Sequence, residues 1–151
     1  MSKIGHYLQE HLSGEVMDSI DARKYFASDS SILFQPPALA IYPRNENAVR
    51  KAVRFSWQLA ERGRLIPISS RGLGSDISGS SLTKGVMLVF SAHLNRILEL
   101  DNKDDFVTVE PGINFGKLQQ TLHTHSKFIP CYPANADYAT VGGVIANNTI
   151  G

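Results

Sequence analysis

The stretch SRGLGSDISG, residues 70–79, follows an apolar run at 65–69 and brings three glycines close together. Glycine accepts positive φ and lets a ligand approach the backbone where no Cβ stands in the way. Successive N–H groups in such a turn can converge on an anion, and the serine hydroxyls add donors. The stretch therefore predicts a loop that holds phosphate or diphosphate, although a plain glycine-rich turn explains it equally well when it is taken alone.

Two familiar phosphate-binding motifs fail here. The dinucleotide fingerprint G-x-G-x-x-G fits Gly72 and Gly74, but Ile77 stands where its third glycine belongs. The P-loop G-x-x-x-x-G-K-[ST] fits the spacing of Gly74 and Gly79, but Ser80 stands in place of its lysine. The loop therefore belongs to neither class.

A second glycine cluster, TVGGVIANN at 140–148, is again rich in small and amide side chains. It reads either as a second ligand-binding segment or as a tightly packed helix start capped by Thr140. Two such clusters in one domain suggest two walls around one elongated ligand. We expect main-chain amides at 72–74 and 142–143 to hold one long anionic cofactor jointly.

The chain around these loops predicts an α+β fold. A strand at 38–42, a helix between the cap Asn45 and Gly63, and a buried strand at 65–69 form a parallel βαβ unit. A strand at 86–90, a hairpin of 97–100 with 106–109, and a helix capped by Asn114 follow, which indicates a mixed or antiparallel second part. Residues 4–25 read as helical, with a break at Gly14 and a second short helix over 16–25.

Composition predicts an ordinary globular protein, with 42% hydrophobic and 19% charged residues in a chain of 151. The formal net charge of +1 gives no reason to expect nucleic acid or an anionic membrane as a partner. A single cysteine, Cys131, suits a reducing cytoplasm. We expect no signal peptide, because residues 1–15 contain no continuous apolar run. We expect no membrane span, because no apolar run approaches about 20 residues.

The motifs, taken in order, resemble the FAD-binding PCMH-type domain of the vanillyl-alcohol oxidase and p-cresol methylhydroxylase superfamily. The similarity is greatest to its branch of FAD-linked D-lactate dehydrogenases and the glycolate oxidase D-subunit. The motifs that carry it are YFASDSSI at 25–32, the segment 38–45, the loop 71–79, LNRI at 94–97, VTVEPG at 107–112, the segment 130–135 and the cluster 140–148.

The resemblance implies which residues bind the cofactor. Residues of the first loop would contact the FAD diphosphate, with Pro111 and Gly112 shaping the adjacent wall and later residues lining the flavin and ribityl side. The implied set is Arg71, Gly72, Leu73, Gly74, Ser75, Asp76, Ser78, Gly79, Pro111, Gly112, Pro133, Gly142, Gly143, Ala146 and Asn147. Some relatives link FAD covalently through a histidine in this loop, which is absent here, so non-covalent FAD is expected.

The resemblance also implies an incomplete domain. We expect 1–37 to be a helical or irregular opening segment and 38–151 to be a PCMH-type domain truncated at its C-terminal side. The catalytic residues would then lie beyond Gly151, in the remainder of a longer polypeptide.

The activity implied is that of an FAD-dependent dehydrogenase oxidising a 2-hydroxy acid or similar alcohol and passing electrons to an acceptor. One alternative is the FAD domain of an enzyme like the enolpyruvyl-UDP-N-acetylglucosamine reductase, whose first loop also contains a G-x-G-S stretch. Another is a truncated, non-catalytic nucleotide-binding module.

Several side chains admit a plain structural role beside a functional one. Asp76 either contacts a ribose or ribityl hydroxyl or caps its own loop, and Arg71 either offsets phosphate charge or packs. His123 and His125 lack a third metal ligand nearby, so no metal site is predicted. Cys131 is expected to be an inert buried thiol, and at least one of Phe55 and Trp57 to lie in the core.

Overall fold

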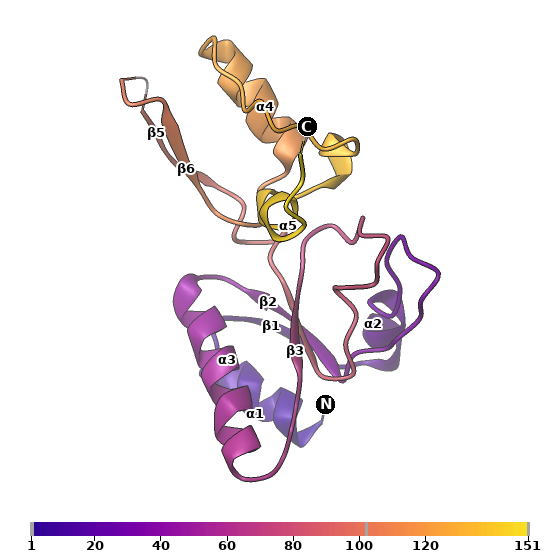
Figure 1. Ribbon diagram of the computed structural model, residues 1–151. Coiled ribbons are helices and arrows are strands. Elements are labelled where there is room, and N and C mark those ends of the chain that lie inside the picture. Colours follow the sequence, from indigo (N-terminus) through magenta and orange to yellow (C-terminus); the bar gives the residue numbers. More distant parts are fainter. Residues whose placement is uncertain (1, 102, 151) are drawn as a thin grey trace.

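The computed structural model describes residues 2–101 and 103–150 and has two lobes, one above the other in Figure 1. The lower lobe holds a four-stranded sheet with the strand order β1-β2-β4-β3. The upper lobe holds a two-stranded hairpin, β5-β6, with helices beside it. The mixture of parallel and antiparallel pairing confirms the predicted α+β class.

Three strands of the lower sheet run parallel. They are β2 (Leu39–Pro43), β4 (Val86–Val89) and β3 (Ile68–Arg71), and β1 (Gly14–Met17) joins β2 in antiparallel register. The predicted strand–helix–strand unit is present as β2-α3-β3, but β4 lies between its two strands. Parallel pairs need a crossover of this kind, which α3 (Glu46–Glu61) supplies.

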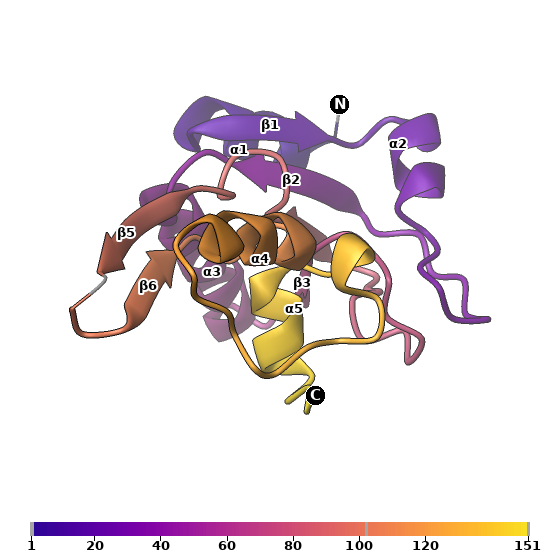
Figure 2. The ribbon, with the colours of Figure 1, turned by 90° about the horizontal axis from the view of Figure 1, so that it is seen from above.

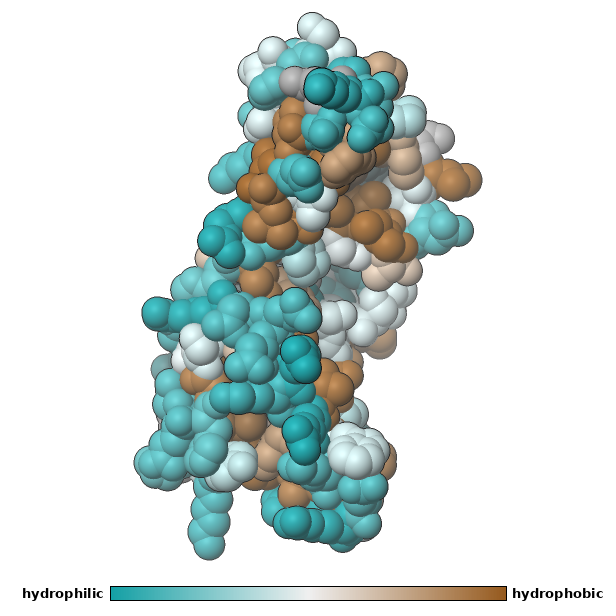
Figure 3. Space-filling model, turned by 90° about the vertical axis from the view of Figure 1, so that its left-hand side faces the viewer, coloured by the Kyte–Doolittle hydropathy of each residue, from teal (hydrophilic) through white to brown (hydrophobic). Residues whose placement is uncertain are grey.

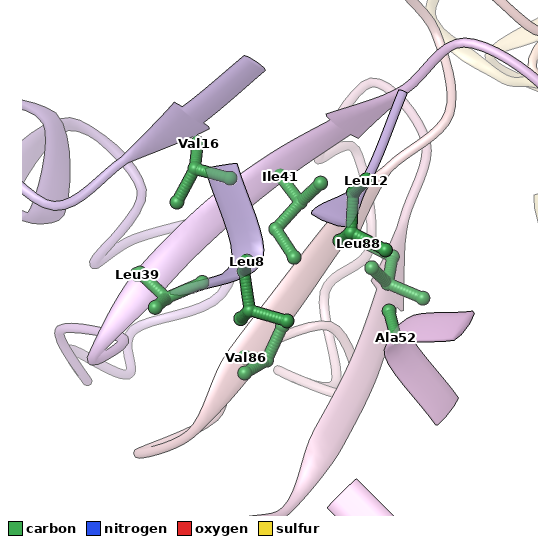
Figure 4. Close-up of a cluster of buried hydrophobic side chains, with 8 residues drawn as sticks. All are labelled: Leu8, Leu12, Val16, Leu39, Ile41, Ala52, Val86 and Leu88. Carbon is green, nitrogen blue, oxygen red and sulfur yellow. The ribbon is translucent and has the colours of Figure 1, made fainter. Parts of the chain in front are cut away.

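Alternate residues of the parallel strands face opposite sides of the sheet, as the two-residue period of a strand requires. On one face Leu39, Ile41, Val86 and Leu88 pack against α1 (Lys3–His11) and α3 through Leu8, Leu12 and Ala52, as Figure 4 shows. On the other face Ala40, Met87 and Val89 pack against Phe26, just after α2 (Ile20–Tyr25). Because both faces are covered, the central strands are apolar throughout.

Helix α3 forms as its sequence predicts. The Asn45 side chain accepts a hydrogen bond from Ala48 N at 2.9 Å, and Gly63 follows the helix end with φ +77°. Phe55 packs against the core, whereas Trp57 is 57% exposed.

Two predicted elements are wrong in detail. Residues 14–17 form strand β1 rather than the start of a helix over 16–25, and the helix begins only at Ile20, after its cap Ser19. The strand predicted at 65–69 lies at Ile68–Arg71, and Leu65 is 82% exposed. The edge position of both strands explains the errors, since an edge strand needs less continuous apolar sequence than a central one.

The upper lobe is the predicted hairpin with its helices. Strands β5 (Ile97–Asp101) and β6 (Phe106–Val109) are antiparallel, and their inner side chains pack on Leu118 and Leu122 of α4 (Phe115–Thr124). The Asn114 side chain caps α4, as predicted. A 3-10 turn η1 (Ala136–Tyr138) and helix α5 (Val141–Ala146) complete the lobe, and the hairpin projects to one side of α4 in Figure 2.

This lobe exposes more apolar surface than the lower one on the face seen in Figure 3, where hydrophobic residues gather over the upper half. Leu98, Phe106 and Phe128 are 57%, 43% and 67% exposed. A two-stranded sheet is marginal by itself, so the hairpin depends on its packing against α4.

Candidate cofactor-binding site

The first glycine loop begins where β3 ends, at Arg71, and lies at the end of the lower lobe that faces α5 in Figure 1. Gly74 and Gly79 have φ +77° and +75°, in the left-handed region that favours glycine. Within the described chain, the backbone N–H groups of residues 72–77 donate no hydrogen bond. Unpaired N–H groups in a row are what an anion needs, so the loop can bind one through its backbone.

Asp76 caps its own loop. Its carboxylate Oδ2 accepts hydrogen bonds from Ser78 N and Oγ at 3.2 and 2.6 Å, and from Ser80 N and Oγ at 2.9 Å each. Burial raises the pKa of Asp76, but these hydrogen bonds outweigh it and lower the pKa below its ordinary value. The geometry favours the capping role, in which the negative charge is balanced by local donors.

The second glycine cluster is a short helix start, α5, of the kind predicted as the alternative. The Thr140 side chain accepts from Gly143 N at 3.2 Å, and Gly142 N donates to Pro111 O at 2.8 Å. Val144 N donates to Thr140 O at 2.9 Å. The expectation that amides at 142–143 hold the cofactor is therefore wrong in its mechanism, because these amides are already paired within the chain.

The wall that α5 forms is anchored at Pro111 by an ion pair between a buried carboxylate, Glu110, and an exposed guanidinium, Arg96. Glu110 is 7% exposed, and its carboxylate accepts from Arg96 Nη2 at 2.8 Å and from Arg96 N at 2.9 Å. The side-chain hydrogen bond from Arg96 is the main cause that lowers the pKa of Glu110. The pair fixes the backbone that presents the Pro111 carbonyl to Gly142.

The two glycine segments meet at Gly72 and Thr140. A Cβ on Gly72 would lie 2.3 Å from Thr140 Oγ1, and a Cβ on Gly142 would lie 3.0 Å from Pro111 Cβ. The glycines thus let the loop, Pro111 and α5 pack closely around one cleft. The cleft has a volume of about 740 Å³, within the range of small-molecule sites.

Most of the predicted residues line this cleft. They are Arg71, Gly72, Leu73, Gly74, Ser75, Asp76, Pro111, Pro133, Gly142, Gly143, Ala146 and Asn147. Ser78 and Gly79 lie outside the lining, with Ser78 on Asp76 and Gly79 packed where a Cβ would meet Leu33 at 2.5 Å. Gly112 also lies outside it and serves packing, because a Cβ there would lie 2.2 Å from Phe90 O.

Arg71 contributes its side chain to the support of the loop. Its Nη1 donates to Ser28 O at 2.9 Å, and its guanidinium carbon lies 5.8 Å from the centroid of the Phe26 ring. Burial lowers the pKa of Arg71 from its ordinary value, partly offset by Asp29. The packing role is thus visible in the contacts.

Sequence reasoning missed part of the lining: Ser70, Ile77, Ser80, Ser81, Phe90, Asn135, Ala139, Thr140, Val144 and Thr149. The polar members Ser80 and Ser81 directly follow the first loop, and Asn135 lies in the 130–135 motif, so a wider window around each motif would have found them.

The remaining side chains considered in the sequence are the histidines His123 and His125 and the single cysteine, Cys131. No group of three His, Cys, Asp or Glu side chains suited to a metal occurs among residues 2–101 and 103–150. His123 and His125 are exposed near the end of α4, and Cys131 is half-buried beside the Thr149 carbonyl rather than fully buried. Among the same residues, no helix has the length and apolar character to cross a membrane.

Comparison with known proteins decides the family. The family model described as FAD binding domain matches residues 37–151. The chain belongs to this FAD-binding family. The predicted resemblance is confirmed, and so is FAD as the cofactor class.

The curated relatives include dehydrogenases of hydroxy acids. D-2-hydroxyglutarate dehydrogenase of Pseudomonas putida is 28% identical, over 91% of this chain and 14% of its own length. Glycolate oxidase subunit GlcD of Bacillus subtilis is 27% identical, over 89% of this chain and 28% of its own. The mitochondrial D-lactate dehydrogenase [cytochrome] of Kluyveromyces lactis is 29% identical, over 89% and 23%. The chain thus spans less than a third of these relatives.

A solved alkyldihydroxyacetonephosphate synthase has the same fold, with a TM-score of 0.82 at 19% identity. The similarity covers 100% of this chain and 30% of that one. Together with the family match, it confirms the predicted PCMH-type α+β fold. The division at residues 37 and 38 stays a prediction, although β1 already joins the sheet of β2.

Proposed function

We propose that residues 72–77 bind the diphosphate of FAD through their backbone N–H groups, and that this chain is the cofactor-binding part of a flavin-dependent dehydrogenase. The observation that carries the proposal is the row of N–H groups that donate to no other described residue and lie beside a cleft of about 740 Å³. Such groups can stabilise an anion without a charged side chain.

The residues present fit FAD. Gly72 and Gly74 leave the backbone open to close approach, and Arg71 supplies positive charge beneath the loop. Asp76 directs its carboxylate to Ser78 and Ser80 and so keeps its charge compensated. We propose that Pro133, Gly142, Gly143, Ala146 and Asn147 form the opposite wall, along the ribityl and flavin side.

Bound FAD supplies the hydride acceptor, and the protein supplies binding and orientation. The loop at 72–77 fixes one end of the cofactor, while the paired amides of α5 keep the facing wall rigid. The loop carries no histidine, so we propose that FAD is held without a covalent bond at this site.

The substrate proposed is a 2-hydroxy acid or a similar alcohol, on the strength of the relatives' names and the PANADYATVGG segment at 133–143. Electrons then pass to a separate acceptor. We place the catalytic residues in a longer polypeptide, because the relatives are three to seven times as long as the parts matched. The lone Cys131 supports a cytoplasmic location.

Purification of the complete gene product tests the proposal. We expect a yellow protein whose flavin is released by acid precipitation. Under anaerobic conditions, D-2-hydroxyglutarate, D-lactate or glycolate should bleach the flavin band, with each L enantiomer, where one exists, as the control. A colourless protein that takes up no added FAD would refute the function and favour a module that folds without flavin.

A further inference from the structure

A short segment outside the matched family domain braces the first glycine loop. This strap, residues 28–31, lies before residue 37, where the family match begins. Ser30 N and Ser30 Oγ both donate to Gly74 O, at 3.1 and 3.3 Å. Two donors from one residue on one carbonyl fix the position of that carbonyl.

The contact with Gly74 O bears directly on anion binding. In a trans peptide the C=O and the following N–H lie in one plane and point in opposite directions. Holding the Gly74 carbonyl on the strap therefore turns the Ser75 N–H away from the strap. Ser75 lines the cleft and its N–H has no hydrogen-bond partner among the described residues, so the strap determines where this donor points.

The strap is itself held to the loop at Ser28 and Asp29. Arg71 Nη1 donates to Ser28 O at 2.9 Å, and the Arg71 guanidinium lies so close to Gly74 that a Cβ there would be 2.2 Å from Nη2. Asp29 accepts from Ser31 N at 2.9 Å and from Ser81 Oγ at 3.3 Å. Ser81 is 7% exposed and lines the cleft. The brace thus joins both flanks of the loop.

We propose that the strap is a positioning element of the diphosphate site, in which Ser30 orients the Ser75 N–H through the Gly74 carbonyl and Arg71 anchors the strap to the loop. The proposal rests on the proposed function, since it concerns how the loop is preorganised for FAD. Neither residue needs to touch the cofactor. Preorganisation raises affinity because the loop loses less freedom on binding.

The test measures FAD affinity of the complete gene product by flavin fluorescence titration for Ser30→Ala, Arg71→Gln and the double variant. Ser30→Ala should weaken FAD binding about three- to tenfold, the effect of one lost hydrogen bond. The loss of FAD affinity in the double variant should be smaller than the product of the two single losses, because both residues act through one loop. The matched control is Ser19→Ala, which removes the hydroxyl that accepts a hydrogen bond from Ala22 N at the start of α2.

Arg71→Lys separates positioning from charge. Lysine keeps the positive charge but has no planar guanidinium. In the wild type the guanidinium both donates to Ser28 O and lies beside Gly74. If Arg71 positions the strap, Arg71→Lys should bind FAD more weakly than the wild type although it keeps the charge. FAD-free Ser30→Ala should have the melting temperature of the FAD-free wild type. Its weaker FAD binding would then not result from a general loss of stability.

The outcomes are distinct. If the wild type binds FAD but Ser30→Ala binds equally well, if the two effects multiply fully, or if Arg71→Lys restores wild-type affinity, the strap proposal is wrong and the proposed function stands. If the wild type itself binds no FAD, both are wrong.

Discussion

In the loop at 72–77 the backbone N–H groups beside the cleft have no hydrogen-bond partner among the described residues, whereas at 142–144 an oxygen of the chain already holds every N–H. Both segments are glycine-rich, and both line the same cleft. In the first, the missing Cβ atoms leave donors open to a ligand. In the second, they let Gly142 pack against Pro111.

Clustered glycines therefore indicate that something approaches the backbone closely, but they do not identify what approaches. A ligand and another stretch of chain use the same freedom. The distinction lies in the hydrogen bonds, which depend on the capping hydroxyl of Thr140 and on the Pro111 carbonyl. Substitutions in the two segments should therefore affect different properties, namely FAD affinity in the first and stability in the second.

The largest expected effect belongs to Gly74→Val. A β-branched residue resists φ +77°, so the loop should change conformation and its N–H groups should lose their arrangement. FAD affinity should fall about 100-fold or more, equivalent to about 2.7 kcal/mol, as measured by fluorescence titration.

Gly63→Val is the matched control for Gly74→Val. Gly63 has the same φ of +77°, and a Cβ there meets nothing within 4 Å. It should cost stability while leaving FAD affinity near that of the wild type. Equal losses of affinity in the two variants would contradict the special role of the first loop.

The next largest effect is a loss of stability when Thr140 is replaced. Thr140→Val keeps the shape of a 3% exposed side chain but removes the oxygen that caps α5. The free energy of unfolding should fall by about 1–2 kcal/mol, the usual value of a lost N-cap. Urea unfolding of the FAD-free protein measures it, with the exposed Thr108→Val of β6 as control. Unchanged stability would show that the second segment does not depend on its internal hydrogen bonds.

Acid should lower the stability of the wall formed by Pro111 and α5, because Glu110 becomes protonated. Its folded-state pKa is lowered by Arg96, so its stabilisation is complete above the unfolded pKa of about 4.3 and is lost as pH falls through the folded value. Glu110→Gln should lose about 1–2 kcal/mol at pH 7 and show a flatter decline of stability below about pH 4.3. Urea unfolding between pH 7 and pH 3 measures both. An unchanged acid slope would contradict the assignment.

The smallest expected effect is that of Leu73→Ala. The Leu73 side chain is 45% exposed, and the proposal uses only the backbone N–H of this residue. FAD affinity should stay within about twofold, as for most exposed substitutions. A loss comparable to that of Gly74→Val would mean that side chains, rather than the backbone, hold the cofactor.

Sequence alone predicted the elements that have strong local signals. The caps Asn45 and Asn114 and the hairpin at 97–109 were all placed correctly, because capping and alternation act within a few residues. β1 was missed because Glu15 and Met17 lie on an edge strand, whose residues are only partly buried. Their place in the sheet depends on a partner some 25 residues away.

The sequence predicted most residues that line the cleft but not the hydrogen bonds that they make. The motifs brought the two walls of the cleft together, but they could not reveal that the amides of α5 are paired. The roles of Gly112 in packing and of Ser30 in bracing Gly74 also depend on contacts distant in sequence. No local pattern encodes such contacts, so they appear only in the folded chain.

Amide hydrogen exchange, measured residue by residue with and without FAD, shows whether the N–H groups of 72–77 bind the diphosphate. We predict that the N–H groups of 72–77 exchange fast in the FAD-free protein and become strongly protected when FAD binds. Those of 142–144 should be protected in both states, because they are paired within the chain. If FAD binds while the exchange of 72–77 stays unchanged, the diphosphate lies elsewhere and the account is wrong.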